Sequence, residues 1–405
     1  MSALSTTRQR NARRWYVGSV TADAGAGEVV DVALAWTAAT TGGSQASLVL
    51  AAAVIPRVLI FPIGGAVADR VGLARVAQIT LGARIVLMAA YVAVLATGFT
   101  NLVVLALIAA AFATADGFHD PAMRPMTKQL TRGDQAALTE LNGASTAARR
   151  TMLIGATFAA GLLAGAGPAA GVLAFLLVMA ALLCMRVLIR IRPDLEEAQA
   201  DSEGSMLKAA AAGITFAVRS RTVRWPLTLL ALSNMIATPA VLLGIPLRST
   251  STGWPGWAYG LVYAAFAAGG VLGAMGTKRF RKRYGLTLRL AAALLLPQAA
   301  GLAVIAVSES PVFSAAAAVV VGICGTMSGV VLISLAQDNT PQAFQGRVGA
   351  MTQFSIGTLI PVGLLLYGVV SHQSLTGAGL GAAVMLLLLG AVGMLVKPVV
   401  GEERV

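Results

Sequence analysis

Long apolar runs alternate with short polar stretches along the whole chain of 405 residues. A helix that crosses a bilayer needs about 20 mostly apolar residues, and twelve runs approach this length. Six lie near residues 15–39, 45–68, 75–97, 100–118, 138–164 and 168–190. Six more lie near residues 225–247, 257–277, 286–307, 311–335, 347–371 and 375–397. The pattern predicts an all-α membrane protein with twelve transmembrane helices.

The two sets of six runs repeat each other, because adding 208 to the limits of each early run gives nearly the limits of a later one. The best local match aligns Gly65-x-x-x-Asp69-Arg70 with Gly273-x-x-x-Thr277-Lys278. We therefore expect two pseudo-symmetric six-helix bundles, residues 1–192 and 225–405, with a cytoplasmic linker at 193–224. Parallel repeats of this kind are typical of transporters in which the halves rock against each other.

The linker itself has two interpretations. An acidic patch is followed by residues 206–221, where apolar residues alternate with Lys208, Arg219 and Arg221. This pattern is typical of an amphipathic helix at the membrane surface. A loosely ordered tether between the halves fits the same residues.

Composition and charge placement exclude other classes of protein. Hydrophobic residues make up 57% of the chain and charged residues only 12%, whereas a soluble domain carries about 25% charged residues. We therefore expect no soluble enzyme. The net charge of +13 comes from Lys and Arg in alternate loops, and only Arg248 breaks this alternation. By the positive-inside rule both termini are cytoplasmic, and nucleic acid is not the expected partner.

The sequence favours a transporter that uses an ion gradient. It has no phosphate-binding loop of the G-x-x-x-x-G-K-[ST] type. Both cysteines lie in apolar runs, and the two histidines are too few and too far apart to suggest a metal site. We expect no cofactor and no metal. The expected partners are the lipid bilayer, a lipophilic small molecule and protons, and the expected state is a monomer.

The stretch from Gly65 to Arg75 reads G-A-V-A-D-R-V-G-L-A-R, and it resembles the G-x-x-x-D-R-x-G-x-x-R signature of the major facilitator superfamily. Four further motifs resemble its macrolide-efflux and enterobactin-exporter-like branch. They are Leu-Ala-Trp at the end of the first run, Ile55-Pro56-Arg57, Asp120-Pro121-Ala122 after the fourth run, and Gly346-Arg347 before the eleventh. This resemblance implies the superfamily fold, alternating access, and a place in the bacterial cytoplasmic membrane.

The resemblance also implies a conformational latch formed by Gly65, Asp69, Arg70, Gly72 and Arg75. A glycine-flanked turn lets two helices approach closely, and a carboxylate such as Asp69 stabilises the positive N-terminal end of a helix. The family holds its outward-facing state in this way, with the arginines in a charge relay. Thr277 replaces the aspartate in the second half, so we expect one latch. The alternative is that these residues are solvated loop charges.

Three carboxylates on the first run, Asp23, Glu28 and Asp31, fall within an arc of about 140° at 100° per residue. Each ionisable group inside a membrane costs at least about 2.5 kcal/mol on insertion scales, so such groups face the protein interior or water. Candidate countercharges for proton coupling are Arg57, Arg84, Arg149 and Arg150. We prefer Glu28 and Asp31 as proton carriers. The alternative is fixed ion pairs, which is the better interpretation for Asp23.

Two features of proton-coupled drug exporters are missing from the sequence. Their fourth helix often carries an arginine, and the run at 100–118 has none. Their fifth helix carries a glycine-proline motif, whereas Gly155 to Gly161 has small residues without proline, which also suits ordinary helix packing. The direction of transport therefore rests on the resemblance to the efflux branch.

The superfamily architecture implies a central cavity lined mainly by the first, fourth, seventh and tenth helices. A mostly apolar pocket with few polar groups suits a lipophilic substrate. Our candidates are Trp36, Asn234, Met235, Thr238, Tyr263, Phe266, Met327, Gln353 and Phe354. Each of them is also explained by simple packing.

Taken together, these patterns predict a secondary active transporter that exports a drug, antibiotic or siderophore in exchange for protons. An importer of a small metabolite on the same fold is the first alternative. A membrane receptor or secretion accessory is the second. The carboxylates of the first run argue against this last class, because a passive scaffold has little reason to keep them.

Overall fold

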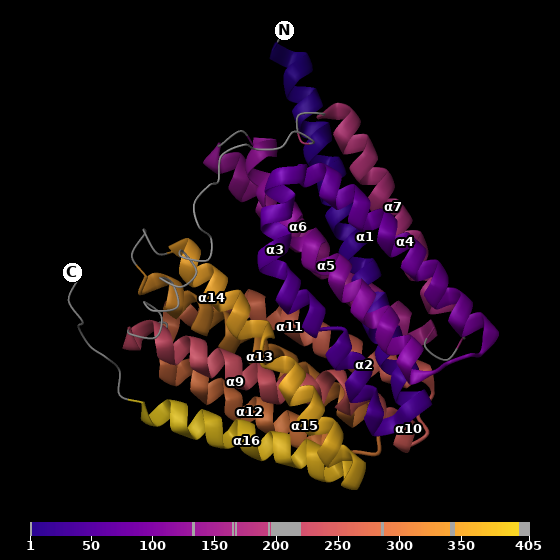
Figure 1. Cartoon of the computed structure of the whole chain (residues 1–405). Coiled ribbons are helices and arrows are strands. Elements are labelled where there is room, and N and C mark those ends of the chain that lie inside the picture. Colours follow the sequence, from indigo (N-terminus) through magenta and orange to yellow (C-terminus); the bar gives the residue numbers. More distant parts are fainter. Residues whose placement is uncertain are drawn as a thin grey trace. The chain divides into compact units, whose positions relative to one another are not determined.

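The computed structural model describes residues 2–131, 134–163, 166, 168–192, 195, 220–284, 287–340 and 345–396, and within them all regular structure is helical (Figure 1). The helices of the first half are α1 (Ser2–Gly42), η1 (Gly43–Gln45), α2 (Ala46–Ala52), α3 (Ile55–Val71), α4 (Leu73–Thr97), α5 (Leu102–Thr131), α6 (Gln135–Leu163) and α7 (Ala169–Ile191). Those of the second half are α9 (Arg221–Leu242), α10 (Gly244–Ser251), α11 (Gly256–Tyr284), α12 (Leu288–Val307), α13 (Pro311–Asp338), α14 (Gln345–Gly357), α15 (Ile360–Gln373) and α16 (Leu375–Leu395). The linker helix predicted at 206–221 lies almost wholly outside the described residues.

The chain divides into two compact units. Unit 1 comprises residues 1–42, 52–202 and 255–260, and unit 2 comprises residues 43–51, 203–254 and 261–405. In unit 1, α1 packs against α6 and α7, and α5 packs against α3 and α4. In unit 2, α12 packs against both α13 and α16. The division predicted at residues 192 and 225 stays a prediction.

Each of the twelve predicted segments coincides with helical structure, which confirms the predicted fold class. Ten stretches of the described chain are long and apolar enough to cross a membrane by length and composition. The first of them, Thr7–Phe61, contains the first predicted segment and most of the second. The helix α6 is not among the ten, because Glu140, Arg149 and Arg150 interrupt its apolar sequence.

Three predicted segments are divided rather than continuous, which corrects the prediction. The segment at 45–68 breaks between α2 and α3, that at 225–247 between α9 and α10, and that at 347–371 between α14 and α15. A proline lies just beyond each break, namely Pro56, Pro246 and Pro361. Proline lacks the N–H that a helix interior requires and is best accommodated in the first turn, which is where Pro56, Pro246 and Pro361 lie. Pro121 and Pro125, by contrast, lie inside α5.

The helix α5 continues to Thr131, thirteen residues beyond the predicted end at 118. The prediction that Asp120-Pro121-Ala122 follows this helix is therefore wrong, because all three residues lie within it. The absence of an arginine from this helix was also predicted wrongly, since Arg124 belongs to α5. The extension places Asp116, His119 and Asp120 on one helical face, at spacings of three and four residues.

Close packing between α3 and α5 depends on two glycines. A Cβ added at Gly64 would overlap the carbonyl oxygen of Gly117, and one added at Gly117 would lie 2.9 Å from Cβ of Ile60. This carbonyl has no helical donor four residues on, because Pro121 lacks an N–H. Small residues allow the backbones of membrane helices to approach closely in this way.

We expect Gly64→Ala to lower the free energy of unfolding by about 1–3 kcal/mol, because the new methyl group overpacks the interface between α3 and α5. Thermal unfolding of the purified protein in detergent measures this effect. The matched control is Gly143→Ala on α6, where an added Cβ meets no atom within 4 Å and helix propensity favours alanine. Equal destabilisation by both variants would contradict the role of Gly64.

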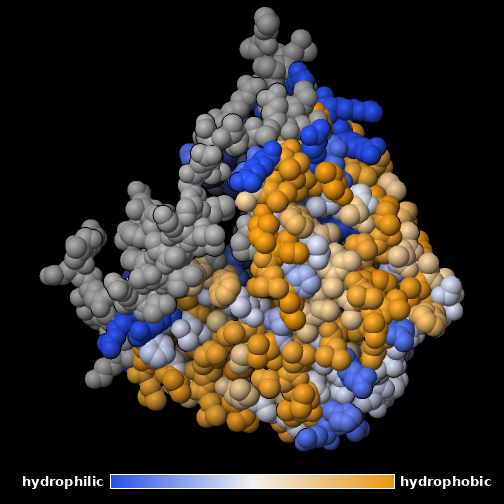
Figure 2. All heavy atoms as spheres, viewed as in Figure 1, coloured by the Kyte–Doolittle hydropathy of each residue, from blue (hydrophilic) through white to orange (hydrophobic). Residues whose placement is uncertain are grey.

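The described surface carries many exposed apolar side chains. Leu395, Phe313 and Val86 have 80%, 71% and 69% of their surface exposed. In Figure 2 hydrophobic residues cover much of the visible described surface, and hydrophilic residues gather near the start of α1. Soluble monomers rarely expose apolar patches of this extent, so the surface is suited to lipid.

Candidate functional site

The ion pair between Asp23 on α1 and Arg84 on α4 lies at the centre of the candidate site in unit 1. An Nη1 hydrogen of Arg84 is donated to Oδ1 of Asp23. The Nε atom of Arg84 lies 3.5 Å from Oδ1 of Asp116 on α5. Only 4% of Arg84 is exposed. One buried guanidinium therefore balances carboxylates from two helices.

His119 on α5 adds a titratable group to this cluster. Its Nδ1 atom lies 2.8 Å from the hydroxyl oxygen of Thr80 on α4, and its Nε2 atom lies 3.5 Å from Oδ2 of Asp23. The side chain is 2% exposed. From the sequence we considered His119 only as a metal ligand and excluded it, because the two histidines are too far apart. The signal that identifies it is its position three residues after Asp116 on the same helix.

A second ion pair joins Arg57 on α3 to Asp120 on α5, with 2.5 Å between Nη2 and Oδ2. About half of the Arg57 side chain is exposed. From the sequence we named Arg57 as a candidate countercharge for the carboxylates of the first helix. Its ion-pair partner is Asp120, which was not among the candidate site residues.

Glu28 and Asp31 have different surroundings, although both belong to α1. The hydroxyl of Thr157 on α6 donates to Oε1 of Glu28 at 2.8 Å. Asp31 is exposed and has no hydrogen bond or ion pair within the described part of the chain. The charges of Glu28, Asp116, Arg57 and Arg84 act on Asp31 through space. Asp31 is therefore free to exchange a proton without breaking a fixed bond.

The two arginines predicted on the fifth helix do not both join the cluster. Arg149 is exposed and acts electrostatically on Asp23. Arg150 is half-buried and has no ion pair with any residue that the structure describes. Of the four countercharges proposed from the sequence, Arg84 alone forms an ion pair with a carboxylate of α1 in the described part of the chain.

Of the five predicted latch residues only Gly72 lies in the turn between α3 and α4. Gly65, Asp69 and Arg70 belong to α3 and Arg75 to α4, so the expectation that they form a loop is wrong. Gly72 has φ +103°, a conformation that side chains other than glycine rarely adopt, and its N–H bonds the Ala68 carbonyl at 3.0 Å. Asp69 is half-buried without a hydrogen bond or ion pair to any described residue, and Arg70 and Arg75 are exposed. Close helix approach uses Gly64, because the nearest atom to a Cβ on Gly65 is 3.8 Å away. The latch stays a prediction.

Several predicted substrate residues make ordinary packing contacts or hydrogen bonds within their own helix. Trp36 stacks on Tyr259 within unit 1, with 5.1 Å between ring centroids. In unit 2, Tyr263 meets Phe266 edge to face at 6.3 Å, and the side-chain amide of Asn234 donates to the Leu230 carbonyl. Met327 is buried. Met235 and Thr238 are half-buried, and Gln353 and Phe354 are exposed. Their role in binding stays a prediction.

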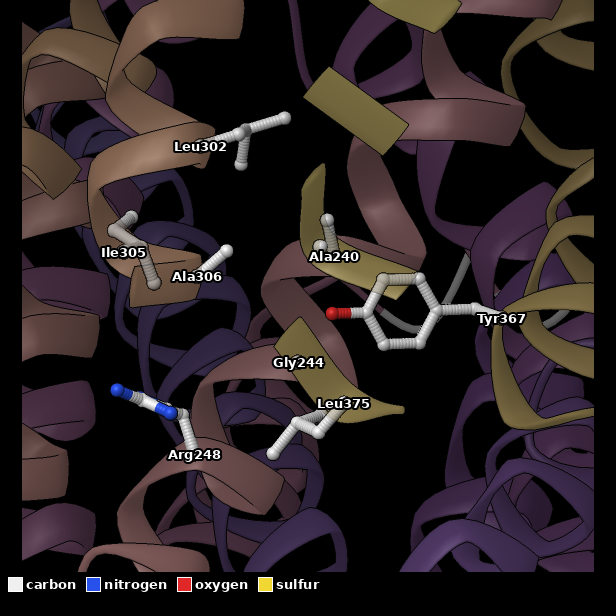
Figure 3. A pocket seen from close by; sticks show the side chains of 9 residues that line it. Ala240, Gly244, Arg248, Leu302, Ile305, Ala306, Tyr367 and Leu375 are labelled. Carbon is white, nitrogen blue, oxygen red and sulfur yellow. The ribbon is translucent and has the colours of Figure 1, made fainter. Parts of the chain in front are cut away.

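A small hollow in unit 2 is not lined by any of these nine residues. It lies between α9, α10, α12, α15 and α16, and has room for about one water molecule. Tyr367 points its hydroxyl into it, on the side that faces Ala306 (Figure 3). The hollow is too small to hold a drug-sized molecule.

Arg248, which lines this hollow, is the one exception to the placement of Lys and Arg in alternate loops. Its contacts explain why a cation lies there. Its Nε and Nη2 atoms donate to the carbonyls of Ser308 and Val307, at 3.0 and 2.9 Å. These carbonyls end α12, where the helix dipole favours a cation. Arg248 therefore caps a helix, and its position does not argue against the predicted topology.

A multi-pass helical chain with ion pairs between its helices, Arg84 with Asp23 and Arg57 with Asp120, suits a membrane transporter. The family model described as Major Facilitator Superfamily matches residues 19–364, and the chain belongs to this superfamily. The comparison with curated proteins found no match.

Solved structures support the same fold. The nucleoside transporter NupG has a TM-score of 0.75 at 12% identity, with 95% of this chain and 98% of that chain covered. A bacterial homologue of the iron transporter ferroportin, in an inward-facing state, has a TM-score of 0.71 at 15% identity, with 98% and 100% covered. At these identities the likeness extends to the fold alone.

Proposed function

We propose that this major facilitator exports a lipophilic small molecule, such as an antibiotic or a siderophore, in exchange for protons. The observation that carries the proton coupling is Asp31, an accessible carboxylate of α1 without a fixed partner in the described chain. Its charge is coupled to Arg84 and Asp116 of the buried cluster. A carboxylate changes its proton affinity when nearby charges move, and alternating access moves them.

Other observations support the direction of transport and the class of substrate. The motifs shared with the macrolide-efflux and enterobactin-exporter-like branch favour export from the bacterial cytoplasm, with both termini on the cytoplasmic side. The nine predicted substrate residues are mostly apolar, which suits a lipophilic solute. The names of the two structural neighbours, a nucleoside transporter and an iron transporter homologue, do not choose between substrates.

Inside-out membrane vesicles test the proposal, because their lumen corresponds to the cell exterior. With an acidic lumen, we expect vesicles that contain the protein to accumulate a member of a panel of lipophilic drugs and siderophores. Collapse of the pH gradient by a protonophore should abolish the accumulation, and vesicles without the protein are the control. Accumulation that does not depend on the pH gradient would contradict proton coupling. Accumulation only in right-side-out vesicles would show import.

A further inference from the structure

The start of α1 and the end of α7 lie side by side at one end of unit 1 (Figure 1). Nε of Arg8 donates to the carbonyl of Ile191 at 2.9 Å, and the hydroxyl of Ser19 donates to the carbonyl of Ala181 at 2.9 Å. These two contacts show that α1 and α7 run antiparallel. This end of the two helices belongs to the predicted cytoplasmic side of the membrane.

Four exposed arginines gather here, and we call them the basic patch: Arg10 and Arg14 on α1, and Arg186 and Arg190 on α7. Arg14 and Arg186 are each five residues from the contact between Ser19 and Ala181, and Arg10 and Arg190 are each nine residues from it. At 1.5 Å per residue the arginines form two matched pairs, about 6 Å apart along the helix axes. Figure 2 shows hydrophilic residues gathered at the start of α1.

No acidic side chain pairs with the basic patch within the described part of the chain. Neither α7 nor residues 2–22 of α1 contain Asp or Glu. The helix α6, which also packs on α1, carries Asp134 before its start and Glu140. Asp134 accepts hydrogen bonds from the N–H groups of Ala136 and Ala137, and Glu140 forms no ion pair with any described residue.

The other charged side chains near this end do not neutralise the basic patch either. Five of them are cations that add to its charge, namely Arg8, Arg13, Arg75, Lys128 and Arg192. The acidic stretch at residues 194–203 lies outside the described residues. Like charges this close repel one another, so the described chain leaves these cations without a matching anion.

The basic patch continues directly into an apolar face of α7. Val172, Leu176 and Leu183 are exposed, and at 100° per residue they share one arc of about 80° with Arg186 and Arg190. One face of the helix is therefore apolar along most of its length and cationic at its end. A phospholipid has the same order, with acyl chains next to a charged headgroup.

We propose that the basic patch binds the phosphate of an anionic phospholipid of the cytoplasmic leaflet, whose acyl chains lie along the apolar face of α7. Guanidinium groups bind phosphate in a bidentate manner, and clusters of cations at the cytoplasmic end of membrane helices attract anionic lipids. Trp15, exposed beside Arg14, suits the level of the headgroups. The bound lipid bridges α1 and α7, whatever the direction and the coupling of transport.

Native mass spectrometry of the purified protein tests this binding. The protein in detergent receives equal amounts of phosphatidylglycerol and phosphatidylethanolamine, and we expect it to retain phosphatidylglycerol at least about tenfold better. Inorganic phosphate at the same concentration should not displace the lipid. Equal retention of the two lipids would overturn the proposal. Displacement by inorganic phosphate would also overturn it, because the patch would then bind a free anion.

A pair of substitutions locates the site. Arg14→Gln with Arg186→Gln should lower the preference for phosphatidylglycerol about tenfold or more, whereas lysine at both positions should keep most of it. The matched control is Arg279→Gln with Arg289→Gln, which removes two exposed cations from α11 and α12 in unit 2. Equal losses in both glutamine pairs would show that overall charge, and not the basic patch, selects the lipid.

A measurement on the wild-type protein locates the site without any variant. Phosphatidylglycerol with a photoreactive group on its acyl chain, close to the glycerol, should label α7 around Leu183. Labelling confined to other helices would overturn the site. The substituted arginines have no contact to lose among the described residues, so the variants should unfold at the wild-type temperature in detergent without added lipid.

Discussion

Arg84→Met is expected to abolish transport and to lower the free energy of unfolding by about 3–5 kcal/mol. Methionine keeps the apolar stem of the side chain but removes the guanidinium. Asp23 then loses its hydrogen-bonded partner and Asp116 its nearby cation. Removing one partner of a buried ion pair leaves the charge of the other partner uncompensated, which accounts for the size of the expected loss of stability. Thermal or denaturant unfolding in detergent and drug accumulation in vesicles measure the two losses.

A double-mutant cycle separates the ion pair from general damage. Asp23→Asn in the Arg84→Met background removes the stranded carboxylate, so the double variant should be more stable than the sum of the two single changes predicts. The control is Arg186→Met, which removes an exposed cation from α7 and should leave stability nearly unchanged. Strict additivity between Arg84→Met and Asp23→Asn would show that the pair contributes nothing to the fold.

The twelve helices could be predicted because lipid imposes a simple rule on sequence. A segment in the bilayer must satisfy its backbone internally and present apolar side chains, so length and hydropathy suffice to find it. The interruptions beside Pro56, Pro246 and Pro361 could not be predicted from proline alone, because Pro121 and Pro297 lie inside continuous helices. Hydropathy also ended the fourth run at 118, although α5 continues as a polar helix to Thr131.

The candidate site could be predicted only in part. The pairing of Asp23 followed from the cost of a charge in the membrane, and Arg84 was among the countercharges named for it. His119 and Asp120 were missed because the end of α5 was placed too early, so both were treated as loop residues. Asp116 lies inside the predicted run at 100–118 and was not selected as a site residue. Thr157 gave no signal, since its contact with Glu28 depends on how α1 and α6 are rotated against each other. Single-sequence patterns carry little information on that rotation.

Asp31→Asn is expected to uncouple transport from the proton gradient without unfolding the protein. The amide cannot take up or release a proton, and the exposed side chain has no hydrogen bond or ion pair to lose among the described residues. The free energy of unfolding should therefore stay within about 0.5 kcal/mol of wild type. In inside-out vesicles, drug exchange without a gradient should continue, whereas the acidic lumen should no longer drive accumulation.

Glu140→Gln is the matched control for this change, because Glu140 is an exposed carboxylate of α6 outside the charged cluster. We expect it to accumulate drug as wild type does. Asp31→Asn should also lose the release of protons that accompanies drug entry, which a pH-sensitive dye outside the vesicles records. If Asp31→Asn still concentrates drug against its gradient and still moves protons, Asp31 is not a carrier. The coupling would then lie with Glu28 or with the buried group around Asp23, because they are the remaining carboxylates of α1.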